Sequence, residues 1–206
     1  QIPKRLVDVI RTPLFLKMFI SISKKENKFK IPSNHAALFQ EYIAEKMKDL
    51  SCSLYDETVI KSILGDYAIY SYENGDCTER FFEILDDTCA GLNKSKVYET
   101  IWKTGLIASG LQGIKYYHKA FHEFFVAMKL STWNNDKLIG WLDDNILNER
   151  YEEVICYLTG IISNHQKQNY VLDYLETHNL KLFMKALKSR RNFDVVEVEL
   201  NLEFAQ

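Results

Sequence analysis

Two histidines that lie four residues apart, His118 and His122, are the side chains of this sequence best suited to chemistry. On a helix, a spacing of four residues places both imidazoles on one face, which is a common arrangement of zinc ligands. The cysteines and aspartates are not grouped with this pair, and the other histidines, His35, His165 and His178, are dispersed. The sequence therefore does not favour a metal site.

His118 has a second potential role, as a hydrogen-bond donor to an anion. It lies between a predicted hairpin, "GLIASGLQGIKYYH" at 105–118, and the helix that follows. The unpaired amides and the dipole at a helix N-terminus favour negative charge there, so an imidazole at this point could donate to a phosphate. The alternative is a structural histidine, and the residue types alone favour that alternative.

The aromatic side chains around and after His118 have a structural explanation. They recur at spacings of four, three, one and three, which is typical of a helix face buried in a core: Tyr117, Phe121, Phe124, Phe125 and Met128. His118 falls one position off this stripe, so core packing does not account for it.

Motifs of known catalytic sites are missing from the sequence. It contains no GxxxxGK[ST], GxGxxG, GxSxG or HExxH motif, and no Cys–His nucleophile pair is evident. The segment "FFEILDD" at 81–87 resembles the apolar run and acid that hold magnesium in nucleotide-hydrolysing proteins. No phosphate loop accompanies it, so the end of an amphipathic helix explains it better. We do not expect this chain to be an enzyme.

The overall composition is that of an ordinary globular protein. Of the 206 residues, 47% are hydrophobic and 26% charged, and the net charge of −2 provides no basic field to attract nucleic acid or an anionic membrane. The four cysteines show neither zinc nor disulfide spacing, and no signal peptide or apolar run of about 18 residues is present. We therefore expect a cytoplasmic protein.

Helical periodicity dominates the chain. Pro13 follows Thr12, a good N-cap, and proline is favoured at the first position of a helix, so a helix is predicted to begin there. A helix capped by Ser95 is predicted to end at Gly105. Other helices are predicted after residue 130, as far as residue 190, and over residues 33–50, 56–72 and 78–89.

These elements predict a mainly α fold: a helical bundle with a winged-helix domain that contains a short β-hairpin, then stacked helices and a C-terminal β-strand. The expected boundaries are 1–30 for the remnant of a helical domain, 31–130 for the winged-helix domain, 131–192 for a helical-repeat-like domain and 193–206 for the strand. Alternation of apolar and polar residues indicates that strand. A lone strand is unstable, so it must pair with another segment or chain.

The segment "KYYHKAFHEFFVAMKL" at 115–130 resembles the "F-x-H-x-x-F-x-E-[FY]-[FL]-x-A-x-x-L" segment of NACHT-type STAND nucleotide switches, the class that includes NOD-like receptors. Three other pieces resemble segments of that family in the same order: "RTPLFLKMFI", "LFQEYIAEKM" and "KTGLIA". The resemblance covers about residues 5–130 and is looser from 131 to 190. It implies the region C-terminal to the nucleotide-binding core: helical domain, winged-helix domain and following helices.

The resemblance implies nucleotide-binding roles for two residues. Pro13 matches the family's proline that packs against adenine, and His118 matches the winged-helix histidine that contacts the β-phosphate of bound ADP. The implied cofactor is ADP or ATP in the full-length protein. None is expected on the isolated fragment, because the phosphate loop, its lysine and the acidic magnesium motif are not in these residues.

The predicted function is therefore the regulatory arm of a NACHT-like signalling ATPase that senses bound ADP or ATP and controls oligomerisation, in innate or antiviral defence. The implied partners are the nucleotide-binding domain of the same protein, further copies of itself on activation, and an unidentified ligand or effector, but no membrane. The alternatives are a winged-helix DNA-binding module and a helical protein-interaction scaffold. Nucleic acid is disfavoured because the hairpin tip, "SGLQG", carries no Arg or Lys for phosphate contacts.

Overall fold

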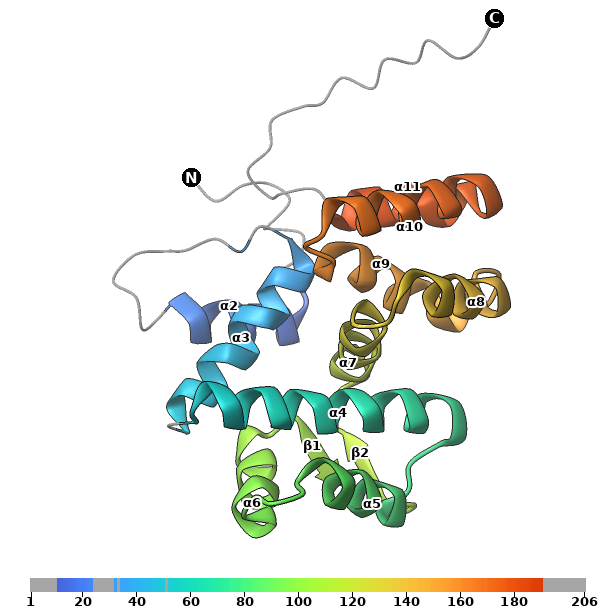
Figure 1. The fold of residues 1–206 in the computed structure, drawn as a ribbon. Coiled ribbons are helices and arrows are strands. Elements are labelled where there is room, and N and C mark those ends of the chain that lie inside the picture. The colour runs from blue at the N-terminus through green and yellow to red at the C-terminus, as the bar shows by residue number, and fades with distance from the viewer. Residues whose placement is uncertain (1–10, 24–31, 33, 51, 191–206) are drawn as a thin grey trace, which may run out of the picture.

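The computed structural model describes residues 11–23, 32, 34–50 and 52–190. This part of the chain is mainly α-helical and includes one two-stranded antiparallel sheet (Figure 1). The elements are α2 (Pro13–Ser23), α3 (His35–Asp49), α4 (Leu54–Asn74), α5 (Thr78–Thr88), α6 (Lys94–Thr104), β1 (Ile107–Ser109), β2 (Ile114–Tyr116), α7 (Lys119–Ser131), α8 (Asn135–Asn145), the 3₁₀ turn η1 (Glu149–Tyr151), α9 (Glu152–Ile161), α10 (His165–His178) and α11 (Leu180–Arg190). The predicted mainly α class is confirmed.

Polar side chains set the helix starts, although not always those expected. Ser53 begins α4 with a capping box, in which its hydroxyl accepts from the Asp56 amide and the Asp56 carboxylate accepts from the Ser53 amide. Asn93, not Ser95, caps α6, because its side chain accepts from an amide three residues on and so starts the helix earlier. Gly105 ends α6 in the left-handed conformation, as predicted.

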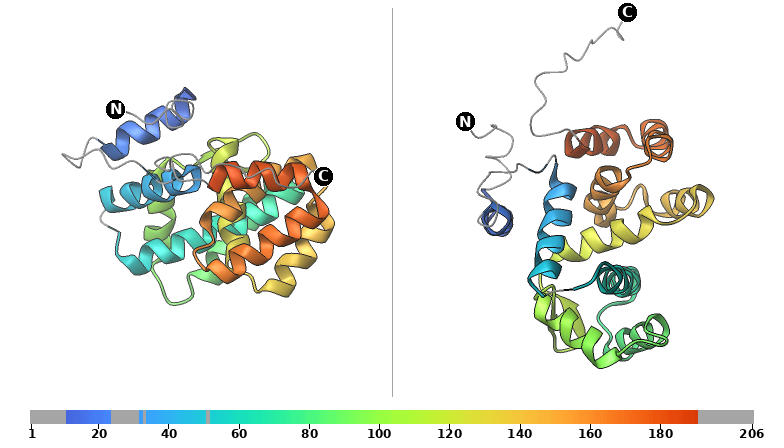
Figure 2. Two further views of the ribbon diagram at one scale, coloured as in Figure 1. Left: turned by 90° about the horizontal axis from the view of Figure 1, so that it is seen from above. Right: turned by 60° about the vertical axis from the view of Figure 1, so that its left-hand side comes forward.

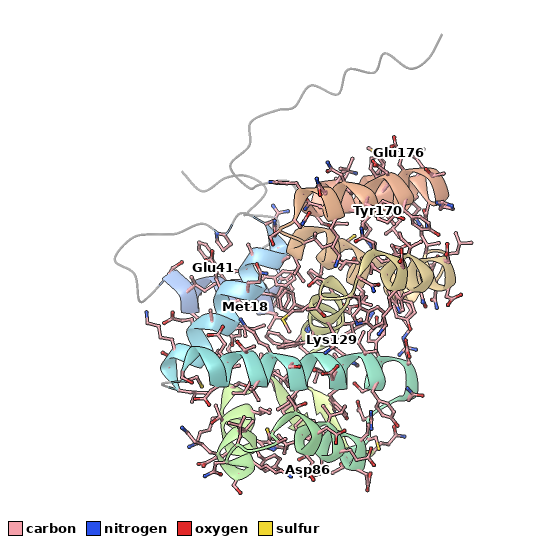
Figure 3. The ribbon with its side chains drawn as sticks, in the orientation of Figure 1. Met18, Glu41, Asp86, Lys129, Tyr170 and Glu176 are labelled. Atoms are coloured by element: carbon pink, nitrogen blue, oxygen red, sulfur yellow. The ribbon has the colours of Figure 1, made fainter. Side chains whose placement is uncertain are left out.

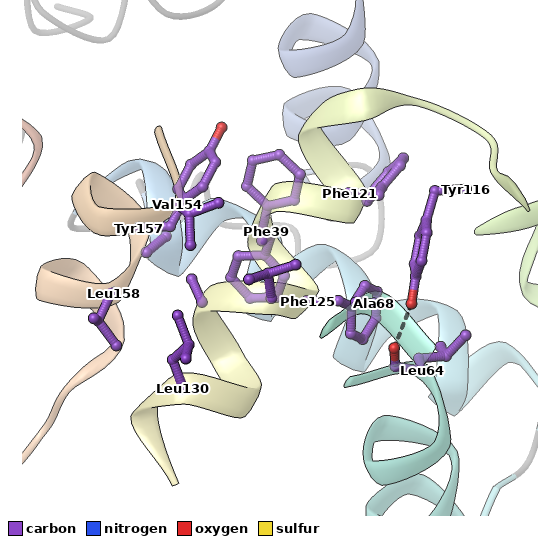
Figure 4. Close-up of a cluster of buried hydrophobic side chains, with 14 of the residues drawn as sticks. Phe39, Leu64, Ala68, Tyr116, Phe121, Phe125, Leu130, Val154, Tyr157 and Leu158 are labelled. Atoms are coloured by element: carbon purple, nitrogen blue, oxygen red, sulfur yellow. Dashed lines mark hydrogen bonds between the residues drawn. The ribbon is translucent and has the colours of Figure 1, made fainter. Parts of the chain in front are cut away.

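Helix α7 lies at the centre of the described structure. It packs against α4 on one side and α9 on another, and α3 also reaches it (Figure 1). Phe124 of α7 stacks on Phe39 of α3 with 5.0 Å between ring centroids. Phe121 meets Phe39 edge-on at 5.5 Å (Figure 4). Its buried residues cover most of its circumference, which is typical of a helix inside a core.

The hairpin packs beneath α4 and leads into α7. Its strands are antiparallel, as the predicted hairpin requires, and they pair with Ile107 opposite Tyr116. The Tyr116 hydroxyl donates to the carbonyl of Leu64 in α4 (Figure 4). Gly113 has a φ of 148°, and a Cβ there would lie 2.9 Å from the amide nitrogen of Thr78, so the hairpin turn requires a glycine against the start of α5.

The remaining helices extend the core outward from α7. Helix α9 carries α11 and α10 on its far side, and α2 lies on the outer side of α3 (Figure 2). The core is continuous across residue 130, because α7 and α9 share it. The predicted C-terminal strand at 193–206, the first ten residues and residues 24–31 lie outside the described residues. Within the described ranges, no helix is long and apolar enough to cross a membrane.

A lysine fixes the end of α7. The ammonium of Lys167, on α10, donates to the carbonyl of Ser131 at 2.6 Å and to the carbonyl of Trp133. These carbonyls lie at the C-terminus of α7, where the helix leaves its last acceptors unpaired and the dipole favours a cation. Lys167 therefore holds the corner between α7 and α8 in place.

The close contact between α3 and α9 provides a test of how these two helices pack. Gly160→Ala should lower the free energy of unfolding by about 1–3 kcal/mol, because overpacking forces the backbones apart. The added methyl would lie 2.9 Å from the Cβ of Ala36, which cannot move without α3. Urea denaturation would measure the change.

Gly140→Ala is the matched control, because Gly140 is also helical but no neighbouring atom lies within 4 Å of the position that its Cβ would take. That substitution should stabilise the chain by about 0.5–1 kcal/mol through helix propensity. Equal stabilisation by both substitutions would contradict the packing described between α3 and α9.

Candidate functional site

His118 is the N-cap of α7, and its side chain is exposed. Its Nδ1 accepts a hydrogen bond of 3.1 Å from the backbone N–H of Ala120. A ring nitrogen that accepts carries no hydrogen, so the neutral imidazole must hold its proton on Nε2. The cap therefore leaves His118 with one N–H donor at the positive end of a helix, which is chemistry suited to an anion.

The backbone on both sides of His118 is firmly held. Before it, the amide of Tyr117 donates to the carbonyl of Leu106 at 2.9 Å, which continues the hairpin pairing. After it, the amides of Phe121 and His122 donate to the carbonyl of His118 at 3.0 and 3.3 Å. The hairpin and the first turn of α7 thus position the imidazole together.

Pro13 takes the first position of α2 and is exposed. The start of that helix is closed by a hydrogen bond from the amide of Leu16 to the carbonyl of Thr12, at 3.0 Å. Helix α2 packs on α3, where Phe15 meets Phe39 edge-on at 5.7 Å. Pro13 and His118 therefore begin two different helices, and α3 lies between α2 and α7 in the chain of contacts that joins them.

His122 contacts α4 and has a different role from His118. Its Nε2 lies 2.9 Å from the hydroxyl of Ser71 and 3.1 Å from the carbonyl of Ala68. Its ring stacks on Tyr116 with centroids 4.6 Å apart, and Tyr72 meets it edge-on at 4.9 Å. These contacts make His122 a link between α4, α7 and the hairpin.

The surroundings of His122 keep its imidazole neutral. Burial lowers its pKa to about 4, the hydrogen bond to the Ala68 carbonyl opposes this shift, and the positive charge of Arg150 adds to it. That guanidinium lies 4.5 Å from the centroid of the Tyr72 ring and donates to the Tyr72 carbonyl.

In the described residues, no group of three or more His, Cys, Asp and Glu side chains is placed to hold a metal ion.

Glu123 is a buried acid that the residue pattern did not single out. Only 4% of the surface of this residue is exposed to solvent, although it lies in the first half of α7. Burial raises the pKa of its carboxyl, and Lys119, whose ammonium lies 3.1 Å from its Oε1, opposes that shift. One signal in the sequence that this acid faces the core was its position next to His122 within an apolar stripe, and Glu123 also matches the glutamate of the family segment that residues 115–130 resemble.

Comparisons with known proteins found no match: no family model, no curated protein and no solved structure matches this chain. The assignment of a function therefore depends on the residues and geometry of the chain itself. Of the two residues singled out from the sequence, His118 is exposed at the start of α7 with its Nδ1 engaged by the Ala120 amide, and Pro13 is exposed at the start of α2.

The neutral state of His122 predicts a pH dependence of stability. The pKa of a histidine in the unfolded chain is about 6.5, whereas that of His122 in the folded chain is about 4. The free energy of unfolding is therefore unaffected by His122 above about pH 6.5, and it falls as the pH drops towards 4, because the unfolded chain then binds the proton more readily. The loss from this residue should be on the order of 2–3 kcal/mol. His122→Gln keeps an amide for the same partners but does not titrate, so it should reduce the slope of stability against pH between 6.5 and 4. Part of the slope should remain, because burial also lowers the pKa of His35.

Urea denaturation at a series of pH values would measure this. His165→Gln is the control, because His165 is exposed at the start of α10, and that variant should keep the slope of the parent. A slope unchanged by His122→Gln would show that other groups cause the acid sensitivity.

Proposed function

We propose that this chain is the regulatory arm of a NACHT-like signalling ATPase, in which His118 senses the β-phosphate of bound ADP. The observation that carries the proposal is the exposed imidazole at the N-terminus of α7, whose Nδ1 is occupied by the cap so that Nε2 is the donor. A phosphate oxygen needs such a donor, and the helix dipole adds to the attraction.

The order of the elements supports a winged-helix arrangement for the middle of the chain. Three helices, α4, α5 and α6, precede the β1–β2 hairpin, and α7 follows it. In this proposal the hairpin is the wing, and the sensor histidine follows its second strand directly. The helices after α7 form the stacked region, and α2 belongs to the helical domain whose Pro13 packs against adenine.

The central position of α7 would let the nucleotide state control the assembly. ADP holds the N-terminus of α7 through His118, and exchange for ATP removes that contact. Because α7 packs against both α4 and α9, a shift of this helix changes the packing on both sides. The population then moves to an open form, which oligomerises through its partner surfaces in the cytoplasm. A role in innate or antiviral defence is part of the same proposal.

The DNA-binding alternative is less well supported by the charges on α6. Lys94 pairs with Asp86 at 2.7 Å, and Lys103 pairs with Glu99 at 2.6 Å. Two cations that a recognition helix would offer to phosphates are thus already neutralised by carboxylates. No observation favours this alternative over the nucleotide sensor.

The test is ADP binding by the full-length protein with two substitutions of the same residue. His118→Asn removes the imidazole but keeps a good N-cap, whereas His118→Ala removes both. Both should weaken ADP binding by about 1–3 kcal/mol, the scale of a charge-assisted hydrogen bond, as measured by calorimetry.

Thermal unfolding separates the cap from the sensor. His118→Ala should destabilise α7 by about 1 kcal/mol, while His118→Asn should leave stability nearly unchanged. Unchanged ADP affinity in the His118→Asn protein would refute the sensor role and leave His118 as a structural cap.

A further inference from the structure

A surface groove with a volume of about 440 Å³ lies between α4, α5 and the corner where α7 meets α8. Its α4 side is one helical stripe, from Asp66 to Asn74. Helix α5 lies below α4 (Figures 1 and 3). At 1.5 Å per residue, this stripe is about 12 Å long. Lys129, at the corner, is eleven residues from His118 on the same helix, or about 16 Å along its axis. The groove is therefore separate from the site at His118.

The groove combines apolar and aromatic surface. Ile69 and Ile84 contribute aliphatic side chains, and Tyr70 and Trp133, both half-buried, contribute aromatic rings. The hydrogen bond from Lys167 to the Trp133 carbonyl holds the backbone of this corner. The aromatic surface is thus present before any ligand binds.

Two of the three cations at the groove are already neutralised. The ammonium of Lys129 lies 2.6 Å from the Asp66 carboxylate. The guanidinium of Arg80 lies 2.8 Å from the Glu83 carboxylate. An anionic ligand would have to break these pairs before it could use either cation.

Two of the three carboxylates that line the groove are in the opposite situation. Glu73 and Asp87 are both exposed, and neither forms an ion pair with any residue in the described part of the chain. The third cation, Lys137, has no carboxylate partner there, and its ammonium lies 3.8 Å from the centroid of the Trp133 ring. The hydrogen bond to Glu83 raises the pKa of the Arg80 guanidinium, and Asp87 also lies near enough to help raise it. Counted together with Glu83, which pairs with Arg80 beside the groove, the site carries four carboxylates and three cations, an excess of one negative charge.

The aromatic rings also favour positive charge. Lys137 covers Trp133, and the guanidinium of Arg80 lies 5.6 Å from the centroid of the Tyr70 ring. The negative face of an aromatic ring attracts an ammonium or a guanidinium, most strongly for Trp. The chain's own Lys137 shows the position that a ligand's cation can take.

We propose that this groove binds a basic peptide segment of a protein partner. A Lys or Arg side chain of the partner replaces Lys137 over Trp133, and a second cation pairs with Glu73 or Asp87. An extended peptide rises about 3.4 Å per residue, so a groove of about 12 Å holds three or four residues. This proposal does not depend on the nucleotide sensor.

The probes for the test are acetylated, amidated tetralysine and tetraarginine, with tetraglutamate as the opposite charge. Calorimetry on the 206-residue chain at low salt should show saturable binding of the basic probes and none of tetraglutamate. The pair Glu73→Gln and Asp87→Asn should weaken that binding about five- to tenfold.

The pair Asp173→Asn and Glu176→Gln is the matched control, because it changes the net charge equally on α10, at the far end of the molecule (Figure 3). It should leave the affinity within about twofold, since exposed charges beyond a Debye length are screened. All four positions are exposed, and thermal unfolding would verify that each protein folds.

Three results would overturn the proposal: equal weakening by both pairs of substitutions, tighter binding of tetraglutamate than of tetralysine, or no saturable binding of either basic probe. Equal weakening would show that the probes respond to overall charge alone. Trp133→Leu adds an independent readout, because it removes the ring but no charge, and it should also weaken the basic probes severalfold.

Discussion

The burial of α7 on nearly all sides is the constraint on which the rest of the described structure depends. A helix with so many apolar side chains can face water over only a small part of its circumference, so α4, α9 and α3 must each cover part of it. The ring of Phe39 on α3 is an example of this cover, because it stacks on Phe124 of α7 and meets Phe121 of α7 and Tyr157 of α9 edge-on. The position of α7 then decides where its two ends, and the groups they carry, meet solvent.

Polar groups inside this core add the directional contacts that hydrophobic packing lacks. The hydroxyls of Tyr67 and Tyr116 donate to backbone carbonyls across the α4–hairpin interface. The imidazole of His122, on α7, forms a hydrogen bond with the hydroxyl of Ser71, on α4. A buried polar group without a partner is costly, so each of these bonds favours one register of the hairpin against α4. Glu123 is one exception, since its Oε1 is buried without a hydrogen bond and depends on the charge of Lys119, and the indole N–H of Trp141 is another.

Local sequence patterns predicted those parts of the fold that local forces determine. The helices, the hairpin at 105–118, the start of α2 at Pro13 and the end of α6 at Gly105 follow from periodicity and from the conformations that proline and glycine favour. The start of α6 was misplaced because Asn93 and Ser95 are both good caps, and only the three-dimensional structure shows which one binds an amide.

The candidate sites were less predictable, because they depend on contacts between distant segments. His118 was identified from its place before a helix, but its tautomer follows from the hydrogen bond to Ala120. The hydrogen bond of His122 to Ser71 could not be predicted, because it depends on the position of α4 beside α7. The groove could not be foreseen, because its lining residues come from α4, α5 and the α7–α8 corner, and neither their proximity nor the pairing of their charges is visible in the sequence.

The two proposed sites lie at opposite ends of one helix, and this has a thermodynamic consequence. An anion held by His118 and a cation held beside Trp133 can influence each other through α7 only if each of them binds one position of α7 more tightly than another. Any such coupling must be reciprocal, so a basic partner that weakens nucleotide binding would itself be released by nucleotide to the same degree. Because α7 is close-packed on both sides, it would move as a rigid element between discrete arrangements, and a small shift at one end would reach the other without loss.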